Sequence, residues 1–288
     1  MSASAADAAL VGTLPLRTRR RRMSAASVVT ALAGLWILLV VLASLVPGLL
    51  VRGDIGALHA SRVLQHPGVT LLGTDQYGRS VAGLLVFGAR GAMIIGVAAT
   101  FLALVLGGLI GLIAGYYGGV TDMIIGRVLD VLLCFPGVLL ALIITVALGP
   151  TTGNLILGVG ISATPSFARV MRGQVMSVRG RLYVHAARSV GFRPSRLLFR
   201  HVMPNAITPV VVLATVSIGT AIVASASLSF LGLGPKHDIP DWGQLLAEGQ
   251  PYLGTAWWMS TFAGLVITCT VIAVSLLGDW IRDRMDRG

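Results

Sequence analysis

The 288-residue chain has little charge and very few acidic residues. Charged residues make up 11% of it and hydrophobic residues 55%, a balance that a soluble globular domain cannot accommodate on its surface. The acidic residues number 11, with none between positions 131 and 237, so the net charge of +11 comes from arginine. These arginines cluster beside apolar stretches, where anionic lipid and membrane orientation explain them better than nucleic acid does. The composition therefore indicates an integral membrane protein in contact with the lipid bilayer, with no nucleic-acid partner.

Lysine is almost absent, which excludes ATP hydrolysis by the chain itself. A phosphate-binding loop needs a lysine directly after its last glycine, whereas the single lysine, Lys236, follows Pro235. The five histidines show no metal-ligand spacing, and no arrangement typical of a nucleophilic enzyme emerges. Both cysteines, Cys134 and Cys269, lie in apolar stretches and are interpreted as small buried hydrophobic residues. We expect a non-catalytic chain with no metal or cofactor of its own.

Six apolar stretches are long enough to cross a bilayer, whose hydrocarbon core of about 30 Å needs roughly 20 helical residues. They cover residues 27–46, 91–115, 121–148, 154–171, 206–230 and 258–277. Their central parts carry no ionisable side chain, which argues against a secondary transporter driven by an ion gradient. Asp122 and Asp130 are interpreted as helix-end residues, with the hydrocarbon part of the third stretch starting near Val131. The sequence predicts an all-α membrane domain of six spans over residues 27–288, preceded by a basic tail over residues 1–26.

Basic residues are distributed very unevenly between the two sides of such a six-span arrangement. Sixteen of them precede the first span, separate the fourth span from the fifth or follow the sixth, while four lie on the opposite side. Cytoplasmic loops carry the excess of Lys and Arg. Both termini and the loop over residues 172–205 are therefore expected in the cytoplasm.

The apolar character of the second stretch begins well before the span itself. As one helix, residues 80–115 would measure about 54 Å, which exceeds the thickness of the bilayer. We therefore expect a separate interfacial helix over residues 80–88, capped by Thr74 or Asp75, with Arg90 at the entry to the span.

Glycine and proline indicate where helices approach closely or bend. Gly107, Gly111 and Gly115 recur at four-residue spacing, which predicts the close approach of another helix backbone, although glycine is common in membrane helices in any case. The prolines expected to bend or end helices are Pro136, Pro165 and Pro209.

The loop between the fourth and fifth spans has a regular layout. Ala186 and Ala187 give a short helix a slim face that can enter a groove of a partner. Gly191 is a natural helix stop, Pro194 can begin a second short helix, and Pro204 lies where the fifth span begins. We interpret this loop as a docking element.

The loop resembles the cytoplasmic coupling loop of bacterial ABC importer permeases. That loop has a Glu-Ala-Ala core, a glycine four residues after the second alanine and a distal proline. Ala186, Ala187, Gly191 and Pro204 match this pattern, and His185 replaces the glutamate. The residues to which the resemblance assigns coupling with an ATPase subunit are His185, Ala186, Ala187, Arg188, Gly191, His201, Pro204 and Asn205.

Two stretches on the opposite side are similar to the C-type permease of dipeptide and oligopeptide importers. They cover residues 72–79, and residues 229–234 followed by 241–243. One interpretation makes them turns and membrane-interface anchors, in which the aromatic belt contains Trp242, Trp257 and Trp258. The other interpretation places them in contact with a ligand. The residues of this outer motif are Gly73, Thr74, Asp75, Tyr77, Gly78, Arg79, Trp242 and Gly243.

The resemblance implies a type I ABC importer permease fold in the inner, or plasma, membrane of a bacterium. It implies a homologous second permease, two ATPase domains, separate or fused, and an extracytoplasmic solute-binding protein as partners. ATP and Mg would be bound by the ATPase subunits, and this chain would form half of the translocation pathway. Peptides are the expected substrate, with nickel chelates, glutathione or haem as alternatives. A membrane scaffold and a secondary transporter are the alternatives of a different class.

Overall fold

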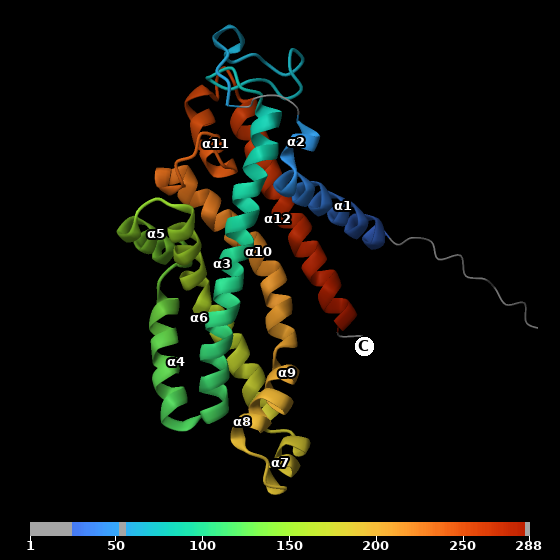
Figure 1. Cartoon of the computed structure of the whole chain (residues 1–288), viewed down its shortest axis with the longest axis vertical. Helices are drawn as coiled ribbons and strands as arrows, with labels where there is room; N and C mark the ends of the chain where they lie inside the picture. Colours follow the sequence, from blue (N-terminus) through green and yellow to red (C-terminus); the bar gives the residue numbers. More distant parts are fainter. Residues whose placement is uncertain (1–24, 52–55, 286–288) are drawn as a thin grey trace, which may run out of the picture.

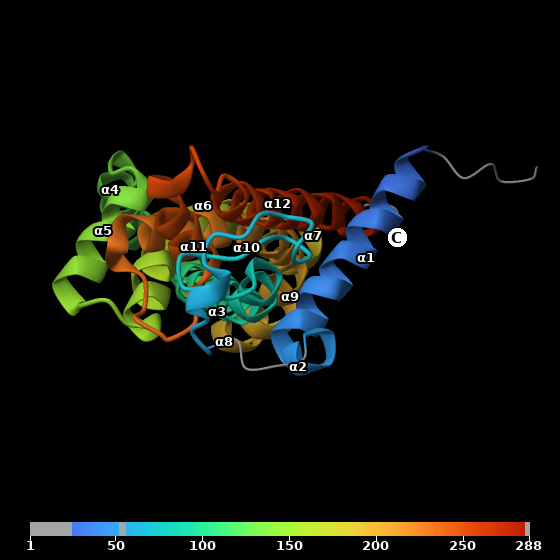
Figure 2. The ribbon, with the colours of Figure 1, turned by 90° about the horizontal axis from the view of Figure 1, so that it is seen from above.

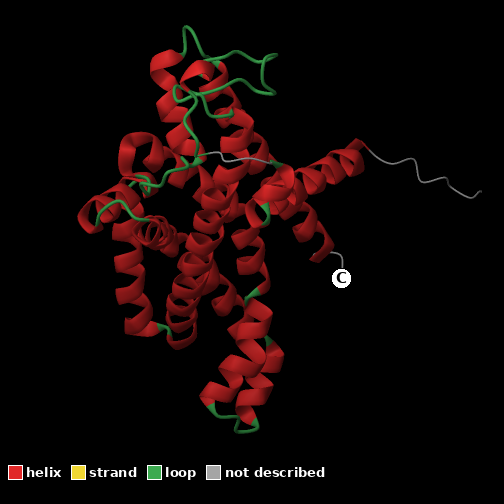
Figure 3. Cartoon of the chain, turned by 45° about the horizontal axis from the view of Figure 1, so that its top comes forward, coloured by secondary structure: helices red, strands yellow, loops and turns green. Residues whose placement is uncertain are grey.

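The computed structural model describes residues 25–51 and 56–285 of the chain. Within these residues it contains helices and loops but no β-strand, apart from isolated bridges between Pro67 and Thr70 and between Thr74 and Ser80. Figure 3 shows that the helices make up the whole body and that long loops gather at one end of it. The prediction of an all-α fold is confirmed for this part of the chain. Residues 1–24 of the predicted basic tail lie outside the described residues.

Helices occupy all six positions where the sequence predicts spans. The four that are long and apolar enough to cross a membrane are α1 (Ala25–Leu45), α3 (Val81–Tyr117), α10 (Thr208–Leu228, extended by the π-helical turn η4, Ser229–Leu233) and α12 (Trp258–Met285). A fifth crossing results if α4 (Gly119–Cys134) and α5 (Gly137–Leu148) form one broken span. The remaining position, the fourth along the chain, holds α6 (Thr152–Arg179), which has 28 residues but is less apolar than the four long helices.

Shorter elements lie at the two ends of the long helices. Those near the beginning of α3 are α2 (Pro47–Leu50), η2 (Ala60–Arg62), α11 (Trp242–Gly249) and η5 (Gln250–Tyr252). Those at the opposite end are α7 (Leu182–Ser189), α8 (Pro194–Leu197), the π-helical turn η3 (Leu198–Val202) and α9 (Met203–Ala206). Figure 1 shows α7 and α8 projecting beyond the long helices, and Figure 2 shows α1 leaving the bundle on the side opposite α4 and α5.

The predicted break before the second span is wrong, because α3 is one continuous helix of 37 residues. Its N-cap is Ser80, whose hydroxyl accepts a hydrogen bond from the Gly83 N–H at 3.4 Å, and neither Thr74 nor Asp75 caps it. Its first turns are covered by protein instead of lipid, since Val81 and Leu84 are fully buried. A helix longer than the bilayer is thus accommodated, because the surplus length packs under α11 and under residues 56–80, named the outer loop.

The third predicted span is interrupted, so its continuity was predicted wrongly. α4 and α5 meet at a bend of 90°, where Phe135 takes an extended backbone conformation (φ −84°, ψ 133°) directly before Pro136. A proline disfavours helical geometry in the residue before it, which explains the break. Pro209 lies in the first turn of α10, so it begins this helix and does not end one, and Pro165 does not end α6.

The glycines of α3 lie against α6, as their spacing predicts. A Cβ atom at Gly107 would be 2.6 Å from the Thr164 carbonyl oxygen, and one at Gly115 would be 2.8 Å from that of Arg172. At Gly111 it would overlap the carbonyl oxygen of Ala168. α3 and α6 therefore pack backbone against backbone and form the central pair of the bundle.

Candidate functional site

The segment over residues 182–205, named the coupling segment after its expected role, begins with a helix that ends as the sequence predicts. Gly191 has φ +87°, a left-handed conformation that favours glycine. The Gly191 N–H donates to the Arg188 carbonyl at 3.0 Å, and the Phe192 N–H donates to the Ala187 carbonyl at 3.3 Å. These two bonds form a Schellman motif at the end of α7, and Pro194 then begins α8.

One face of α7 packs onto the body of the protein and the other is exposed. Val184 is buried in a cluster that includes Leu197, and Ala187 is half-buried against the same cluster. Ala186 is exposed. Large apolar side chains near it are also exposed, with Leu182 88% and Val190 79% accessible. Of the two motif alanines, Ala186 is thus the one available to a partner.

The coupling segment is bonded to the end of α3, which is in turn bonded to the end of α6. The Tyr116 hydroxyl, in the last turn of α3, donates to the Pro194 carbonyl at 2.9 Å. Arg179, the last residue of α6, donates to the carbonyl oxygen of Tyr116 at 2.6 Å and to that of Gly115 at 3.3 Å. The guanidinium thereby satisfies carbonyls left free at the C-terminus of α3. Motion of the coupling segment is therefore tied to both α3 and α6.

The second half of the motif lies in a wide helical turn. His201 belongs to η3, its ring packs edge-on against Phe192 at 5.6 Å between centroids, and its buried Nε2 has no hydrogen-bond partner among the described residues. Asn205 donates to the His201 carbonyl at 2.7 Å. Pro204 and Asn205 are exposed in α9, as are His185 and Arg188 in α7. These residues share one end of the molecule (Figure 1).

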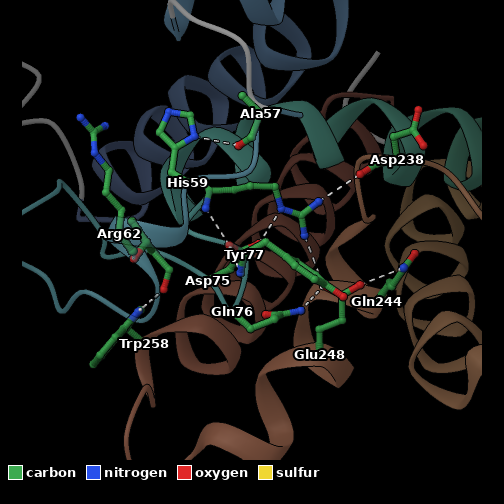
Figure 4. A network of polar contacts seen from close by, with 12 residues as sticks. Ala57, His59, Arg62, Asp75, Gln76, Tyr77, Asp238, Gln244, Glu248 and Trp258 are labelled. Atoms are coloured by element: carbon green, nitrogen blue, oxygen red, sulfur yellow. Dashed lines mark hydrogen bonds and ion pairs between the residues drawn. The ribbon is translucent and has the colours of Figure 1, made fainter.

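At the opposite end, the outer motif forms a polar network centred on a buried carboxylate (Figure 4). The Asp75 side chain is fully buried. One of its oxygens accepts from the Tyr77 N–H at 2.9 Å and the Arg79 N–H at 2.7 Å, and the other accepts from Arg79 Nε at 2.6 Å. Burial of a carboxylate is tolerated when it is paired and hydrogen-bonded in this way. Asp75 therefore fixes the turn that leads into α3.

Arg79 and Glu248 connect this turn to α11. Arg79 donates to the Asp238 carbonyl at 3.0 Å and lies 3.6 Å from the Glu248 carboxylate. That carboxylate also accepts from Gln76 at 3.0 Å and from Gln244 at 2.9 Å. The result is an outer clasp between residues 75–79 and 238–248, and Glu248 is a member that sequence reasoning missed because it belongs to no motif.

Two of the three tryptophans are buried anchors, so their assignment to the aromatic belt is wrong. Trp242 is 2% exposed and donates to the Leu85 carbonyl at 2.8 Å, while Trp258 is 3% exposed and donates to the Thr74 carbonyl at 3.1 Å. Trp257 is 51% exposed. Each buried ring therefore joins two segments through its indole N–H.

The glycines of the outer motif are required by close approach and by backbone conformation. Gly73 has φ +80°, and a Cβ there would lie 2.5 Å from Trp258 Nε1. Gly78 has φ +78°, and a Cβ there would overlap the His59 carbonyl. Gly243 meets the Ala226 backbone of α10 in the same way. The geometry of the motif matches the interpretation as turns.

Sequence reasoning also missed two ion pairs between α4 and α6. Asp122 accepts two hydrogen bonds from Arg172, one of them at 2.7 Å from Nη2, and Asp130 accepts one from Arg169 at 2.6 Å. Asp122 does lie in the first turn of α4, as predicted, but Asp130 lies within the helix. The sequence pattern that could have indicated these pairs is the presence of two acidic residues in the third predicted span and two arginines at the end of the fourth.

The two cysteines differ in how far they are buried. Cys134 is exposed at the end of α4, which contradicts the prediction, and Cys269 is half-buried in α12. No cluster of three or more His, Cys, Asp or Glu with metal-binding geometry occurs in residues 25–51 and 56–285.

The long apolar helices, with an arginine-rich segment projecting from one end of the bundle, define a multi-pass membrane protein. The chain belongs to the family described as binding-protein-dependent transport system inner membrane component, whose model matches residues 107–288. It is 39% identical to the dipeptide transport system permease protein DppC of Alkalihalophilus pseudofirmus over 74% of this chain and 70% of that protein. It is 38% identical to the glutathione transport system permease protein GsiD of Pectobacterium atrosepticum over 75% of this chain and 71% of that protein.

A solved structure confirms the fold. The crystal structure of an amino acid ABC transporter with histidines superimposes with a TM-score of 0.52 at 19% identity, covering 67% of this chain and 92% of that chain. The predicted type I permease fold and the predicted family are therefore confirmed. The chain is an inner-membrane permease component of a binding-protein-dependent ABC transporter.

Proposed function

We propose that this chain is one of two permease subunits of an ATP-driven importer that takes up peptides. The proposal of peptides is supported by the relatives, which are named as dipeptide, di/tripeptide and glutathione transport permeases. In this proposal the chain supplies half of the translocation pathway and catalyses no reaction itself. ATP and Mg are bound by partner ATPase subunits, and an extracytoplasmic solute-binding protein delivers the substrate to the complex.

The observation that carries the proposal is the structure of the coupling segment. It presents Leu182, Ala186 and Val190 to solvent although these side chains are apolar or small, and such exposed apolar surface is typical of an interaction site. The same segment is bonded to the end of α3 through Tyr116, and it continues directly from α6, whose last residue, Arg179, is itself bonded to the end of α3. A partner that docks on this face can therefore displace the two central helices of the bundle.

The topology that this function requires has both termini and the coupling segment in the cytoplasm. It can be tested with single cysteines at positions 57 and 185, in a background that lacks Cys134 and Cys269. An impermeant thiol reagent added to intact cells should label position 57 and should label position 185 only after the membrane is opened. Labelling of position 185 from outside would refute the topology.

The function itself is tested by uptake into proteoliposomes. The chain is reconstituted with its second permease, ATPases and binding protein, with ATP on the side of the coupling segment. We expect ATP-dependent accumulation of radiolabelled trialanine, which unlabelled dipeptides and tripeptides inhibit. Preferential uptake of glutathione, a nickel chelate or haem would replace peptide as the substrate. Uptake by this chain alone without ATP would indicate a secondary transporter, and an intact complex that imports nothing would indicate a scaffold.

A further inference from the structure

Apolar packing contributes little to the attachment of α4 to the rest of the chain. Of its 16 residues, Leu129 is the one that is buried. Large apolar side chains on its other faces, including Met123 at 59% and Val131 at 60%, are exposed. The contacts that bind α4 to α6 must therefore be sought among its polar side chains.

The polar contacts are the two ion pairs, which occupy successive levels along α4 and α6. At the end near the coupling segment, Asp122 and Arg172 form a two-bonded pair with side chains 17% and 34% exposed. Further from the coupling segment, Asp130 and Arg169 form a second pair, with side chains 59% and 57% exposed. A carboxylate and a guanidinium joined by two hydrogen bonds have a defined distance and a defined relative orientation. The first pair therefore determines how α4 and α6 lie against each other.

The next helix, α5, is attached to α6 in a different way. A Cβ atom at Gly158 would lie 2.6 Å from the Thr145 hydroxyl and 2.8 Å from the Ala141 carbonyl. Ala141 and Thr145 are fully buried. Close packing of small residues thus holds α5, while charged side chains hold α4, and the 90° bend lies between these two regions.

The helix that receives both contacts is also the one that continues into the coupling segment. α6 ends at Arg179 and α7 begins at Leu182. We propose that Asp122, Asp130, Arg169 and Arg172 form a charge clamp that makes α4 move with α6, so that displacement of the coupling segment reaches the bent α4–α5 span. These four are positioning residues, and their role rests on the proposed function of the chain as an importer permease.

Charged groups suit this role because separating them removes the partner of each charge. Removing one member of a partly buried pair, such as Asp122 with Arg172, leaves the other uncompensated. The clamp therefore resists sliding of α4 along α6 more strongly than the exposed apolar side chains of α4 could.

The test is a charge exchange in the reconstituted complex. Arg172→Asp places two carboxylates opposite each other, Asp122→Arg places two guanidiniums there, and the double variant restores one of each. The quantity measured is trialanine imported per ATP hydrolysed, together with the abundance of the complex. We expect each single variant to lower this ratio about tenfold while ATP hydrolysis continues, and the double variant to recover most of it, since coupled residues show interaction energies that correspond to such factors.

The matched control is Arg127→Asp, which changes a charge on the same helix at an exposed side chain with no ion pair in the described structure. It should leave the ratio unchanged. If the single variants fail to insert, Asp122→Asn and Arg172→Gln give the same comparison without repulsion.

The outcomes separate the clamp from the proposed function. A ratio that is unchanged in well-inserted single variants refutes the clamp, and so does a double variant no better than the singles. A merely structural role would lower import and ATP hydrolysis in proportion to complex abundance, leaving the ratio constant. Failure of the wild-type complex to import trialanine refutes the proposed function instead.

Discussion

The contact between α3 and α6 can be tested by adding a single methyl group. In Gly111→Ala, the new Cβ would overlap the Ala168 carbonyl oxygen and lie 2.8 Å from Met171 Cβ and 2.9 Å from the Arg172 amide nitrogen. Two of these three neighbours are backbone atoms, which cannot rotate away. The two helices must therefore separate, and overpacking of this kind costs about 1–3 kcal/mol.

Gly108→Ala is the matched control on the same helix. A Cβ at Gly108 has no neighbouring atom within 4 Å. Both substitutions gain about 1 kcal/mol of helix propensity, so the comparison between the two variants removes this contribution. We expect Gly108→Ala to be as stable as the wild type or more stable, and Gly111→Ala to be less stable than Gly108→Ala by about 1–3 kcal/mol.

The assay is thermal unfolding of the purified chain in detergent, followed by size-exclusion chromatography of the remaining monomer. A difference of this size corresponds to several degrees in the apparent melting temperature for a chain of this length. Equal melting temperatures for Gly111→Ala and Gly108→Ala would refute close backbone packing of α3 on α6.

Three further substitutions test the coupling segment and the outer clasp. Gly191→Val should lower the stability of the α7 cap by about 1–2 kcal/mol, because φ is +87° there and a side chain is strained in the left-handed region. It should weaken co-purification of the ATPases, and a wild-type yield of co-purified ATPase would contradict the Schellman cap. Ala187→Glu should abolish substrate-stimulated ATP hydrolysis, since the half-buried site cannot accept a desolvated carboxylate; normal uptake by a well-expressed complex would show that this segment does not couple. Trp258→Phe leaves the Thr74 carbonyl without its donor and should lower stability by about 1–3 kcal/mol, whereas the exposed Trp257→Phe should not, and equal melting temperatures would contradict the anchor.

Local signals in the sequence predict the ends and contacts of helices well. The end of α7 at Gly191, the start of α8 at Pro194 and the approach of α6 to Gly107 and Gly111 all follow from short-range rules. Such features depend on the backbone conformation or volume of one residue. They remain predictable without knowledge of the surrounding fold.

Features that depend on distant segments were not predictable in this way. The thickness of the bilayer predicts a shorter span than α3, yet α11 and the outer loop cover the first turns of this helix. That cover is a result of tertiary packing. Trp242 and Trp258 were assigned to the membrane interface because apolar flanks and a polar N–H suit both the interface and a buried anchor. Only the positions of the Leu85 and Thr74 carbonyls distinguish the two.

The ion pairs also depend on segments that are distant in the sequence, so they could not be predicted from local signals. Asp130 and Arg169 are separated by 39 positions, and no rule of spacing along one helix connects them. Their pairing requires the antiparallel packing of α4 on α6 (Figure 1). Charge complementarity between adjacent spans is the pattern that would have indicated it.

The segment over residues 182–205 is proposed to transmit motion between ATPase subunits and this chain. The most direct measurement places a photo-crosslinking amino acid at position 186, on the exposed face of α7, and at position 59 in the outer loop as the control. Irradiation of membranes that contain the whole complex should join position 186 to an ATPase subunit and should join position 59 to none. Capture of an ATPase at position 59, or at neither position in an assembled complex, would contradict the account.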